Sequence, residues 1–309
     1  MIAIDRTRPL DIMLERLFDY AGMFPPASRS FAEALRESAD LSSTLERPWL
    51  VACDLVLDTQ HARNLLDIKL SDCDFKSYGF KSTLTICLLA TEEHAEVINV
   101  AQRLSIPPPS GDINCRISSI EAKVTPASLT GTLAAFKDYT STNQILLALE
   151  PDLSTDSWRS TLKETVREIS MLGSNVALKC RCSGPAGIEA PPLAQAIIES
   201  ADAKISLKVT GGLHHPIVDQ ARNPYPIGFL NLAAAVMFRR TLGAKAPLER
   251  LIELLQNSSM EAFSFASGLL FKDLQISKEQ LLQARSQAHL SIGSCSLSEP
   301  DNDLIHYLY

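Results

Sequence analysis

Two lysines in this sequence are each followed closely by glycine, a pattern that suits a reactive amine beside a bound ligand. Lys179 begins the run KCRCSG, and Lys208 begins the run KVTGGLHHP. Burial lowers the pKa of a lysine, and a second cation nearby lowers it further, which leaves a neutral amine able to attack a carbonyl. We therefore expect a Schiff-base lysine here. The alternative is that each lysine pairs with a buried carboxylate such as Glu121, Glu150 or Asp54.

Glycine is scarce in the chain and clustered near these lysines. Only 13 of the 309 residues are glycine, and five of them fall between positions 184 and 228. A glycine after a strand lets the backbone approach a ligand and leaves N–H groups that bind anions. We expect a phosphate or carboxylate to bind near Arg181, at two stretches of the chain. These stretches contribute Gly211, Gly212, Gly293, Ser294 and Ser296.

Two adjacent histidines, His214 and His215, follow the second lysine motif. Histidine can act as a general acid or base near neutral pH, and it also binds metals. This leaves a second interpretation open, a metal-assisted isomerase or hydrolase that uses one histidine with Glu150 or Asp54. A third is a barrel that binds a metabolite without catalysis. The leading interpretation requires no cofactor and no metal.

The elements that must position these residues alternate between strand and helix. An alternation of this kind predicts parallel strands joined by right-handed crossovers. Several strands carry apolar side chains on one face and polar ones on the other, which favours a closed barrel with a polar interior over an open sheet. We predict an α/β fold of the (β/α)8 TIM-barrel type, one domain over 1–309 with a helical insertion at about 228–257. The expected strands are 50–57, 83–89, 116–124, 144–150, 175–182, 204–210 and 290–296.

Composition narrows the classes of partner. The chain has 36 acidic and 29 basic residues, a net charge of −7, which argues against a nucleic-acid binder. The first residues lack the apolar core of a secretory signal, and the apolar run 229–238 is too short to span a membrane. Seven cysteines, an odd number, favour free thiols in a reducing compartment. We expect a cytoplasmic protein that binds a small anionic metabolite, no nucleic acid and no membrane. Homo-oligomer formation is left open.

Taken in order, the motifs resemble those of deoxyribose-phosphate aldolases and related class I aldolases. The run from Lys179 to Gly184 resembles the K-T-S-T-G motif of the Schiff-base lysine in that family, and is one residue longer. The run from Lys208 to Leu213 resembles its second lysine motif, K-A-S-G-G-I. Three further similarities are looser. The segment Phe18–Pro25 resembles the opening I-D-H-T-x-L-x-P strand of the family, and Ile120–Val124 resembles its I-D-x-V strand. Residues 293–296 resemble its phosphate-binding G-T-S-S turn. Segments around 19–27, 212–216 and 293–300 also resemble bacterial proteins with no assigned activity.

The resemblance implies a TIM barrel and an aldolase-like lyase that acts on a small phosphorylated or carboxylated carbonyl compound. Lys179 would form the iminium, Lys208 would lower its pKa, and Glu121 or Glu150 would move a proton. Asp19 and Asp54 would lie in the substrate site on the first two strands, although Asp19 could instead cap a turn. The sequence departs from the family where Arg181 interrupts the first motif and where Glu121 replaces an aspartate.

Overall fold

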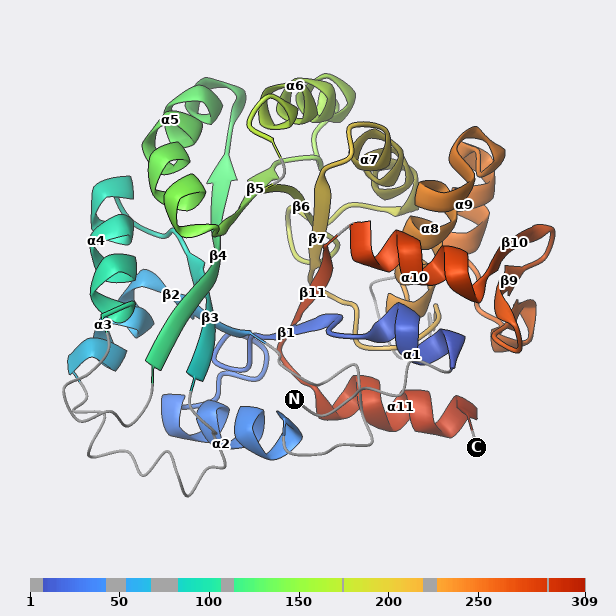
Figure 1. Ribbon diagram of the computed structural model, residues 1–309, viewed down its shortest axis with the longest axis horizontal. Coiled ribbons are helices and arrows are strands. Elements are labelled where there is room, and N and C mark those ends of the chain that lie inside the picture. Colours follow the sequence, from blue (N-terminus) through green and yellow to red (C-terminus); the bar gives the residue numbers. More distant parts are fainter. Residues whose placement is uncertain are drawn as a thin grey trace.

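The structure is a computed structural model that describes residues 8–42, 54–67, 83–106, 114–173, 175–218, 227–287 and 289–308. Eight parallel strands close into a barrel, in the order β1-β11-β7-β6-β5-β4-β3-β2 (Figure 1). The predicted (β/α)8 TIM-barrel fold is therefore confirmed. The barrel strands are β1 (Phe18–Tyr20), β2 (Leu55–Asp58), β3 (Thr83–Leu89), β4 (Asn114–Val124), β5 (Leu146–Pro151), β6 (Val176–Arg181), β7 (Ser206–Thr210) and β11 (Leu290–Ser294).

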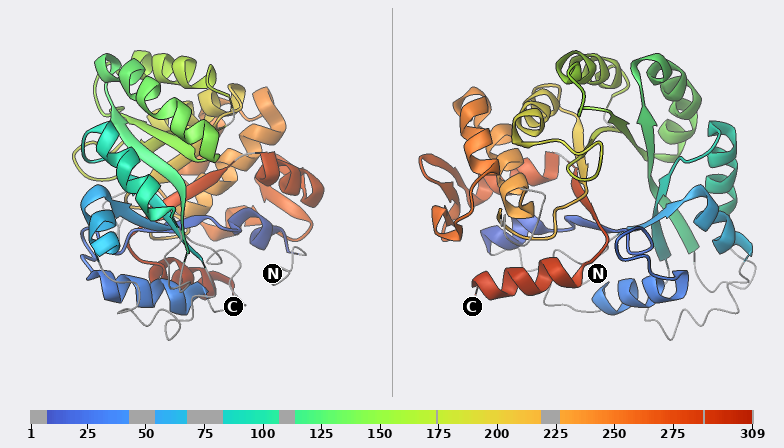
Figure 2. Two further views of the ribbon diagram at one scale, coloured as in Figure 1. Left: turned by 60° about the vertical axis from the view of Figure 1, so that its left-hand side comes forward. Right: turned by 180° about the vertical axis from the view of Figure 1, so that it is seen from behind.

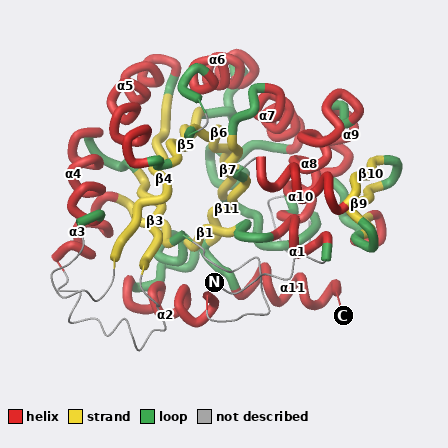
Figure 3. Tube along the Cα trace, in the orientation of Figure 1, coloured by secondary structure: helices red, strands yellow, loops and turns green. Residues whose placement is uncertain are grey.

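Helices between the strands form the outer layer of the barrel (Figure 3). The helix α5 begins with a capping box, in which Thr125 and Ser128 each accept a hydrogen bond from the backbone of the other, and Pro126 occupies its first turn. The helices up to β7 are α1 (Pro9–Leu14), α2 (Phe31–Ser42), α3 (Thr59–Asp67), α4 (His94–Leu104), α5 (Pro126–Asn143), α6 (Trp158–Ser170) and α7 (Ala190–Asp202).

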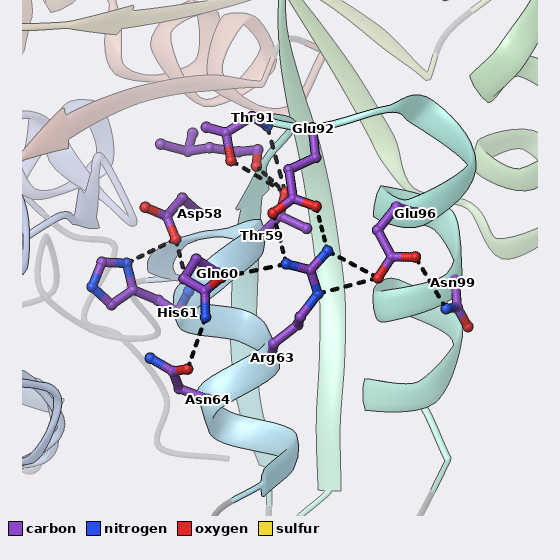
Figure 4. Close-up of polar contacts among 11 residues, drawn as sticks. Asp58, Thr59, Gln60, His61, Arg63, Asn64, Thr91, Glu92, Glu96 and Asn99 are labelled. Atoms are coloured by element: carbon purple, nitrogen blue, oxygen red, sulfur yellow. Dashed lines mark hydrogen bonds and ion pairs between the residues drawn. The ribbon is translucent and has the colours of Figure 1, made fainter.

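A polar network fixes α3 and α4 to each other (Figure 4). Asp58 Oδ1 accepts a hydrogen bond from the backbone N–H of His61 at 2.7 Å, as expected of a residue that caps the helix after β2. Arg63 on α3 donates to Glu96 on α4 at 3.0 Å and also pairs with Glu92, just before α4. The helices that follow β2 and β3 in the chain are thus joined at their surface.

A long segment separates β7 from β11, and it contains the predicted helices between 228 and 257. A small antiparallel sheet follows them, in the order β10-β9-β8. Figure 2 shows this sheet and α9 to one side of the barrel. The elements are α8 (Phe229–Leu242), α9 (Leu248–Leu255), β8 (Phe263–Ser264), β9 (Gly268–Phe271), β10 (Leu274–Ser277) and α10 (Lys278–Gln287), with short 3-10 turns at Gly243–Lys245 and Met260–Ala262. The helix α11 (Ser298–Leu308) follows β11.

Alternation along the strands places apolar side chains outside the barrel and polar ones inside. On β6, Leu178 and Cys180 are buried against the helical layer, whereas the side chain of Lys179 contacts carboxylates on β4 and β5 inside the barrel. The register then decides which interior residues are neighbours. Lys179 is paired with Lys208, and Arg181 with Thr210. Two properties of the strands therefore place both lysines: alternation directs their side chains into the barrel, and the register of β6 and β7 makes them neighbours.

Within these described ranges, no helix is both long enough and apolar enough to cross a membrane. The buried helix α8, which contains the apolar run 229–238, is 14 residues long.

Gly228 precedes α8 at a point where the chain passes very close to itself. A Cβ at this position would lie 2.4 Å from the Pro216 carbonyl oxygen and 2.5 Å from Ile217 Cα. We expect Gly228→Ala to lower the free energy of unfolding by about 1–3 kcal/mol, because backbone atoms would have to shift. Gly131→Ala is the matched control: in the exposed middle of α5 a Cβ meets nothing within 4 Å, and alanine should stabilise the helix by up to about 1 kcal/mol. Urea unfolding measures both, and equal effects would contradict this account.

Candidate active site

Two lysines lie side by side inside the barrel. Lys179 on β6 and Lys208 on β7 are direct register partners, and both side chains are buried, with 6% and 2% of their surface exposed. Neighbouring parallel strands are only about 4.8 Å apart, so two ammonium groups here would repel each other strongly without compensation. The site must therefore contain carboxylates at the same depth.

Glu121 on β4 supplies the charge that the two lysines share. Its Oε2 lies 2.6 Å from Lys179 Nζ and its Oε1 lies 2.6 Å from Lys208 Nζ. Burial acts to raise the pKa of Glu121, but the ammonium groups of Lys179 and Lys208 outweigh burial and hold this pKa well below its ordinary value. Glu121 is thus an anion that bridges two cations.

Each lysine also contacts a second carboxylate. Glu150 Oε2, on β5, lies 2.5 Å from Lys179 Nζ, and Asp19 Oδ2, on β1, lies 2.6 Å from Lys208 Nζ. On the mouth side, the Arg181 guanidinium binds Glu150 through Nε at 2.6 Å and Nη2 at 3.2 Å. Three cations and three carboxylates therefore form one continuous buried cluster.

The expected lowering of the lysine pKa values is wrong. Burial does act to lower the pKa of Lys179, but the carboxylates of Glu121 and Glu150 more than compensate and raise it above its ordinary value. Lys208 behaves in the same way, with Asp19 as its strongest electrostatic partner. Because Glu121 lies between the two amines, the charge of Lys208 is neutralised before it can act on Lys179. The alternative interpretation, pairing with barrel carboxylates, describes the resting site.

A thiol that sequence reasoning missed completes the cluster. Cys87 Sγ on β3 donates to Glu121 Oε1 at 3.0 Å and accepts from Lys208 Nζ at 3.3 Å. Burial, reinforced by the Glu121 charge, raises the pKa of Cys87 well above its ordinary value, so the thiol stays protonated as a donor. The signal was available: along β3, Cys87 shares its strand face with Thr83 and Thr85.

Asp54, immediately before β2, lies deep in the barrel and does not contact either lysine directly. Ser118 donates to its Oδ2 at 2.5 Å, and its Oδ1 is buried with no hydrogen-bond partner among the described residues. Burial and the nearby Asp19 charge raise the pKa of Asp54 to about 6. A fourth carboxyl group thus lies near the cluster and holds its proton below that pH.

A cavity of about 900 Å³ opens above this cluster. Lys179 and Glu121 contribute to its lining from below, and Arg181, Gly211, Gly212 and Gly293 from the strand ends. Lys208 is not among the described residues that line it, and neither are Asp19, Asp54, Glu150 and Ser294. The Ser294 hydroxyl instead donates to the Ser296 carbonyl at 2.5 Å, while Ser296 itself borders the cavity. The structure therefore gives the two lysines different access to a ligand.

The rim of the cavity comes from segments outside the barrel strands. One side is formed by residues 24–27 and Arg29 after β1, together with Glu37 on α2. Another is formed around the start of α11 by Cys295, Ser296, Ser298 and Glu299. The helices α2 and α11 lie on the same side of the barrel in both Figure 1 and Figure 2. Sequence reasoning missed Arg29, Glu37 and Glu299 at this rim, because their place beside the cavity depends on how the segments after β1 and β11 pack over the barrel and not on a periodic pattern.

His214 and His215 line the cavity at its rim, as predicted, but their partners differ from those expected. His214 Nδ1 lies 2.9 Å from Glu299 Oε2, and His215 Nδ1 makes a short contact with Asp303 on α11. The predicted pairing of a histidine with Glu150 or Asp54 is wrong, because both carboxylates lie deeper and are bound by other groups. Among the described residues, no three His, Cys, Asp or Glu side chains are grouped so as to hold a metal ion.

The cysteines that the structure describes are all free thiols: Cys87, Cys115, Cys180, Cys182 and Cys295. Cys53 and Cys73 lie outside the described residues.

No known family model matches the chain, and no curated protein matches it either.

Glu121 is the most sensitive point of the charge cluster. We expect Glu121→Gln to lower the free energy of unfolding by about 3–5 kcal/mol, because the substitution leaves two buried ammonium groups short of their shared anion. Glu164→Gln, on the exposed surface of α6, is the matched control and should change stability little. Urea denaturation at pH 7 measures both, and a small loss for E121Q would show that the lysines do not depend on this carboxylate.

Asp54 predicts a defined pH dependence. The folded protein keeps the Asp54 proton up to a pH of about 6, whereas the ordinary pKa is 3.8. Stability therefore falls as the pH rises from about 4 to 6, by on the order of 3 kcal/mol for this group. We expect Asp54→Asn to remove this loss. Unfolding measurements between pH 4 and 7 should give D54N a growing advantage over the wild type, and a constant difference would contradict the assignment.

Proposed function

We propose that the chain is an aldolase-like lyase that acts on a small anionic carbonyl compound through a Schiff base on Lys179. One observation carries this proposal: the Lys179 amine reaches the floor of the cavity while two carboxylates contact it at 2.5 and 2.6 Å. A lysine in this position is both accessible to a ligand and supplied with groups that can move its proton. The similarity of the two lysine motifs to class I aldolases supports the same assignment.

The raised pKa of Lys179 is compatible with this chemistry. An ammonium and a carbonyl give an iminium and water, with no net gain or loss of a proton. Attack itself needs the neutral amine, and Glu121 or Glu150 can accept the proton because each contacts Nζ directly. The iminium carries the same positive charge as the ammonium it replaces. The carboxylates that hold the resting lysine charged therefore also stabilise the product of the first step.

Lys208 acts in this proposal as a positioning residue. It holds Glu121 Oε1 at 2.6 Å, so that Oε2 of the same carboxylate is directed to Lys179. Its own amine is enclosed by Asp19, Glu121 and Cys87 beneath the cavity. Arg181 and the glycines at the strand ends would bind the anionic group of the substrate.

Trapping with borohydride tests the proposal. The full-length protein is incubated with a panel of aldehydes and 2-oxo acids, reduced, digested and analysed by mass spectrometry. We expect a reduced adduct on Lys179 and none on Lys208, because only Lys179 borders the cavity. Lys179→Met should abolish the adduct. Lys163→Met, which removes an exposed lysine of α6, is the control and should leave it intact.

Two results would count against the proposal. An adduct that persists in the K179M/K208M double variant would remove both lysines from the role. Ligand binding without any adduct across the panel, in protein whose thermal unfolding is normal, would favour a barrel that binds a metabolite without catalysis.

A further inference from the structure

Arg181 has hydrogen-bonding capacity that the charge cluster does not use. A guanidinium carries five N–H donors, and Glu150 engages only Nε and Nη2 of Arg181. No partner for Nη1 is found in the part of the chain that the structure describes. The side chain is 32% exposed and lines the cavity, in contrast with the sealed Lys208. Arg181 can therefore bind a planar anion through its outer edge while it remains bound to Glu150.

The distance between this edge and the reactive amine is limited by Glu150. A single oxygen, Glu150 Oε2, contacts Lys179 Nζ at 2.5 Å and Arg181 Nη2 at 3.2 Å. The two nitrogens can therefore be no farther apart than the sum of these contacts, 5.7 Å. A substrate that bonds to Nζ and also hydrogen-bonds to Nη2 must fit within that span.

We infer that the substrate is a 2-oxo acid whose carboxylate binds Arg181. This inference rests on the proposed Schiff base at Lys179. In a 2-oxo acid the carbonyl carbon is bonded directly to the carboxylate carbon, so carbon and carboxylate oxygen are about 2.4 Å apart. The iminium adds a C–N bond of about 1.3 Å and the contact with Arg181 adds a hydrogen bond of about 2.8 Å. At ordinary bond angles these lengths fit within that upper limit.

A phosphorylated carbonyl compound fits this span less well. Its phosphate oxygens are four bonds from the carbonyl carbon, about 5 Å in an extended chain, and would reach Arg181 Nη2 within this span only if the chain folded back. Charge favours the same choice. The cluster already contains three carboxylates against three cations, and a fourth lies near it when Asp54 ionises. A carboxylate adds one negative charge, whereas a phosphate adds about 1.5 to 2.

The opposite side of the cavity suits the remaining part of a 2-oxo acid. Leu89, at the end of β3, lines the cavity and is the register partner of Glu121. An apolar surface therefore lies beside the carboxylate that contacts Lys179, and away from Arg181 on β6. With its carboxylate on Arg181, the substrate would direct carbon 3 towards Glu121 and Leu89. Glu121 Oε2 is then the oxygen available to accept a proton from that carbon.

The bond changes in the first step balance without a further reagent. Lys179 Nζ passes one proton to Glu121 or Glu150 and attacks the keto carbon, forming the C–N bond. The keto oxygen leaves as water with that proton and one more from nitrogen. The iminium nitrogen keeps one hydrogen and the positive charge.

Competing carbonyl compounds test this inference. The full-length protein is incubated with pyruvate, dihydroxyacetone phosphate or hydroxyacetone, reduced with borohydride, and the adduct on Lys179 is quantified against concentration. We expect the half-saturating concentration for pyruvate to be at least about tenfold lower than for either other compound. In Arg181→Gln, the ratio of the hydroxyacetone value to the pyruvate value should fall by about tenfold or more. Arg167→Gln, on the exposed surface of α6, is the control and should leave that ratio unchanged.

The outcomes distinguish the inferred 2-oxo acid substrate from the proposed Schiff base on Lys179. If none of these compounds labels Lys179 in protein with normal thermal unfolding, the 2-oxo acid is overturned, and the Schiff base is overturned with it if the aldehydes of the trapping panel also fail to label Lys179. If dihydroxyacetone phosphate or hydroxyacetone labels Lys179 as readily as pyruvate does, only the 2-oxo acid is overturned. The 2-oxo acid inference is also overturned, and the Schiff base is not, if R181Q leaves the ratio of the hydroxyacetone value to the pyruvate value unchanged.

Discussion

The bridge that Glu121 makes between two buried ammonium groups is the interaction on which the interior of this barrel depends. The register of β6 and β7 places Lys179 beside Lys208, and neither strand offers a negative charge at that level. Glu121 reaches both amines from β4, each at 2.6 Å. Buried charges are tolerated when they are paired and hydrogen-bonded on every side. Glu150 is the second partner of Lys179, and Asp19 and Cys87 are the further partners of Lys208.

Much of the architecture could be predicted from the sequence, because the relevant information is local. Alternation along β6 and β7 separates Leu178 and Leu207 from Lys179 and Lys208, and this alternation distinguishes a barrel with a polar interior from an open sheet. The glycines at 184, 211, 212 and 293 were expected near a ligand site, and all four line the cavity. Turn and cap residues such as Asp58 act over a few positions, so they too can be identified without a structure.

The electrostatic state of the site could not be predicted in the same way. The expectation that burial lowers a lysine pKa was sound physics, but its outcome depends on which carboxylates share the same depth. That depth is set by the stagger of strands far apart in the chain, as for Glu121 and Lys208. The partners of His214 and His215 are likewise set by the packing of α11, a helix more than 80 residues farther on. The sequence thus pointed to both lysines and to Glu121 and Glu150, whereas the register between distant strands decides which of these groups are paired and charged.

The separation between the floor of the cavity and its rim has a consequence for how such a protein can change through mutation. The charge cluster is carried by strands, and a single inserted residue in β6 or β7 would exchange an interior side chain for an exterior one. The rim is carried by the connections after β1, β7 and β11, where insertions disturb no strand pairing. Mutations in these connections can therefore change which molecules enter the barrel, while the lysines and carboxylates of the charge cluster are retained.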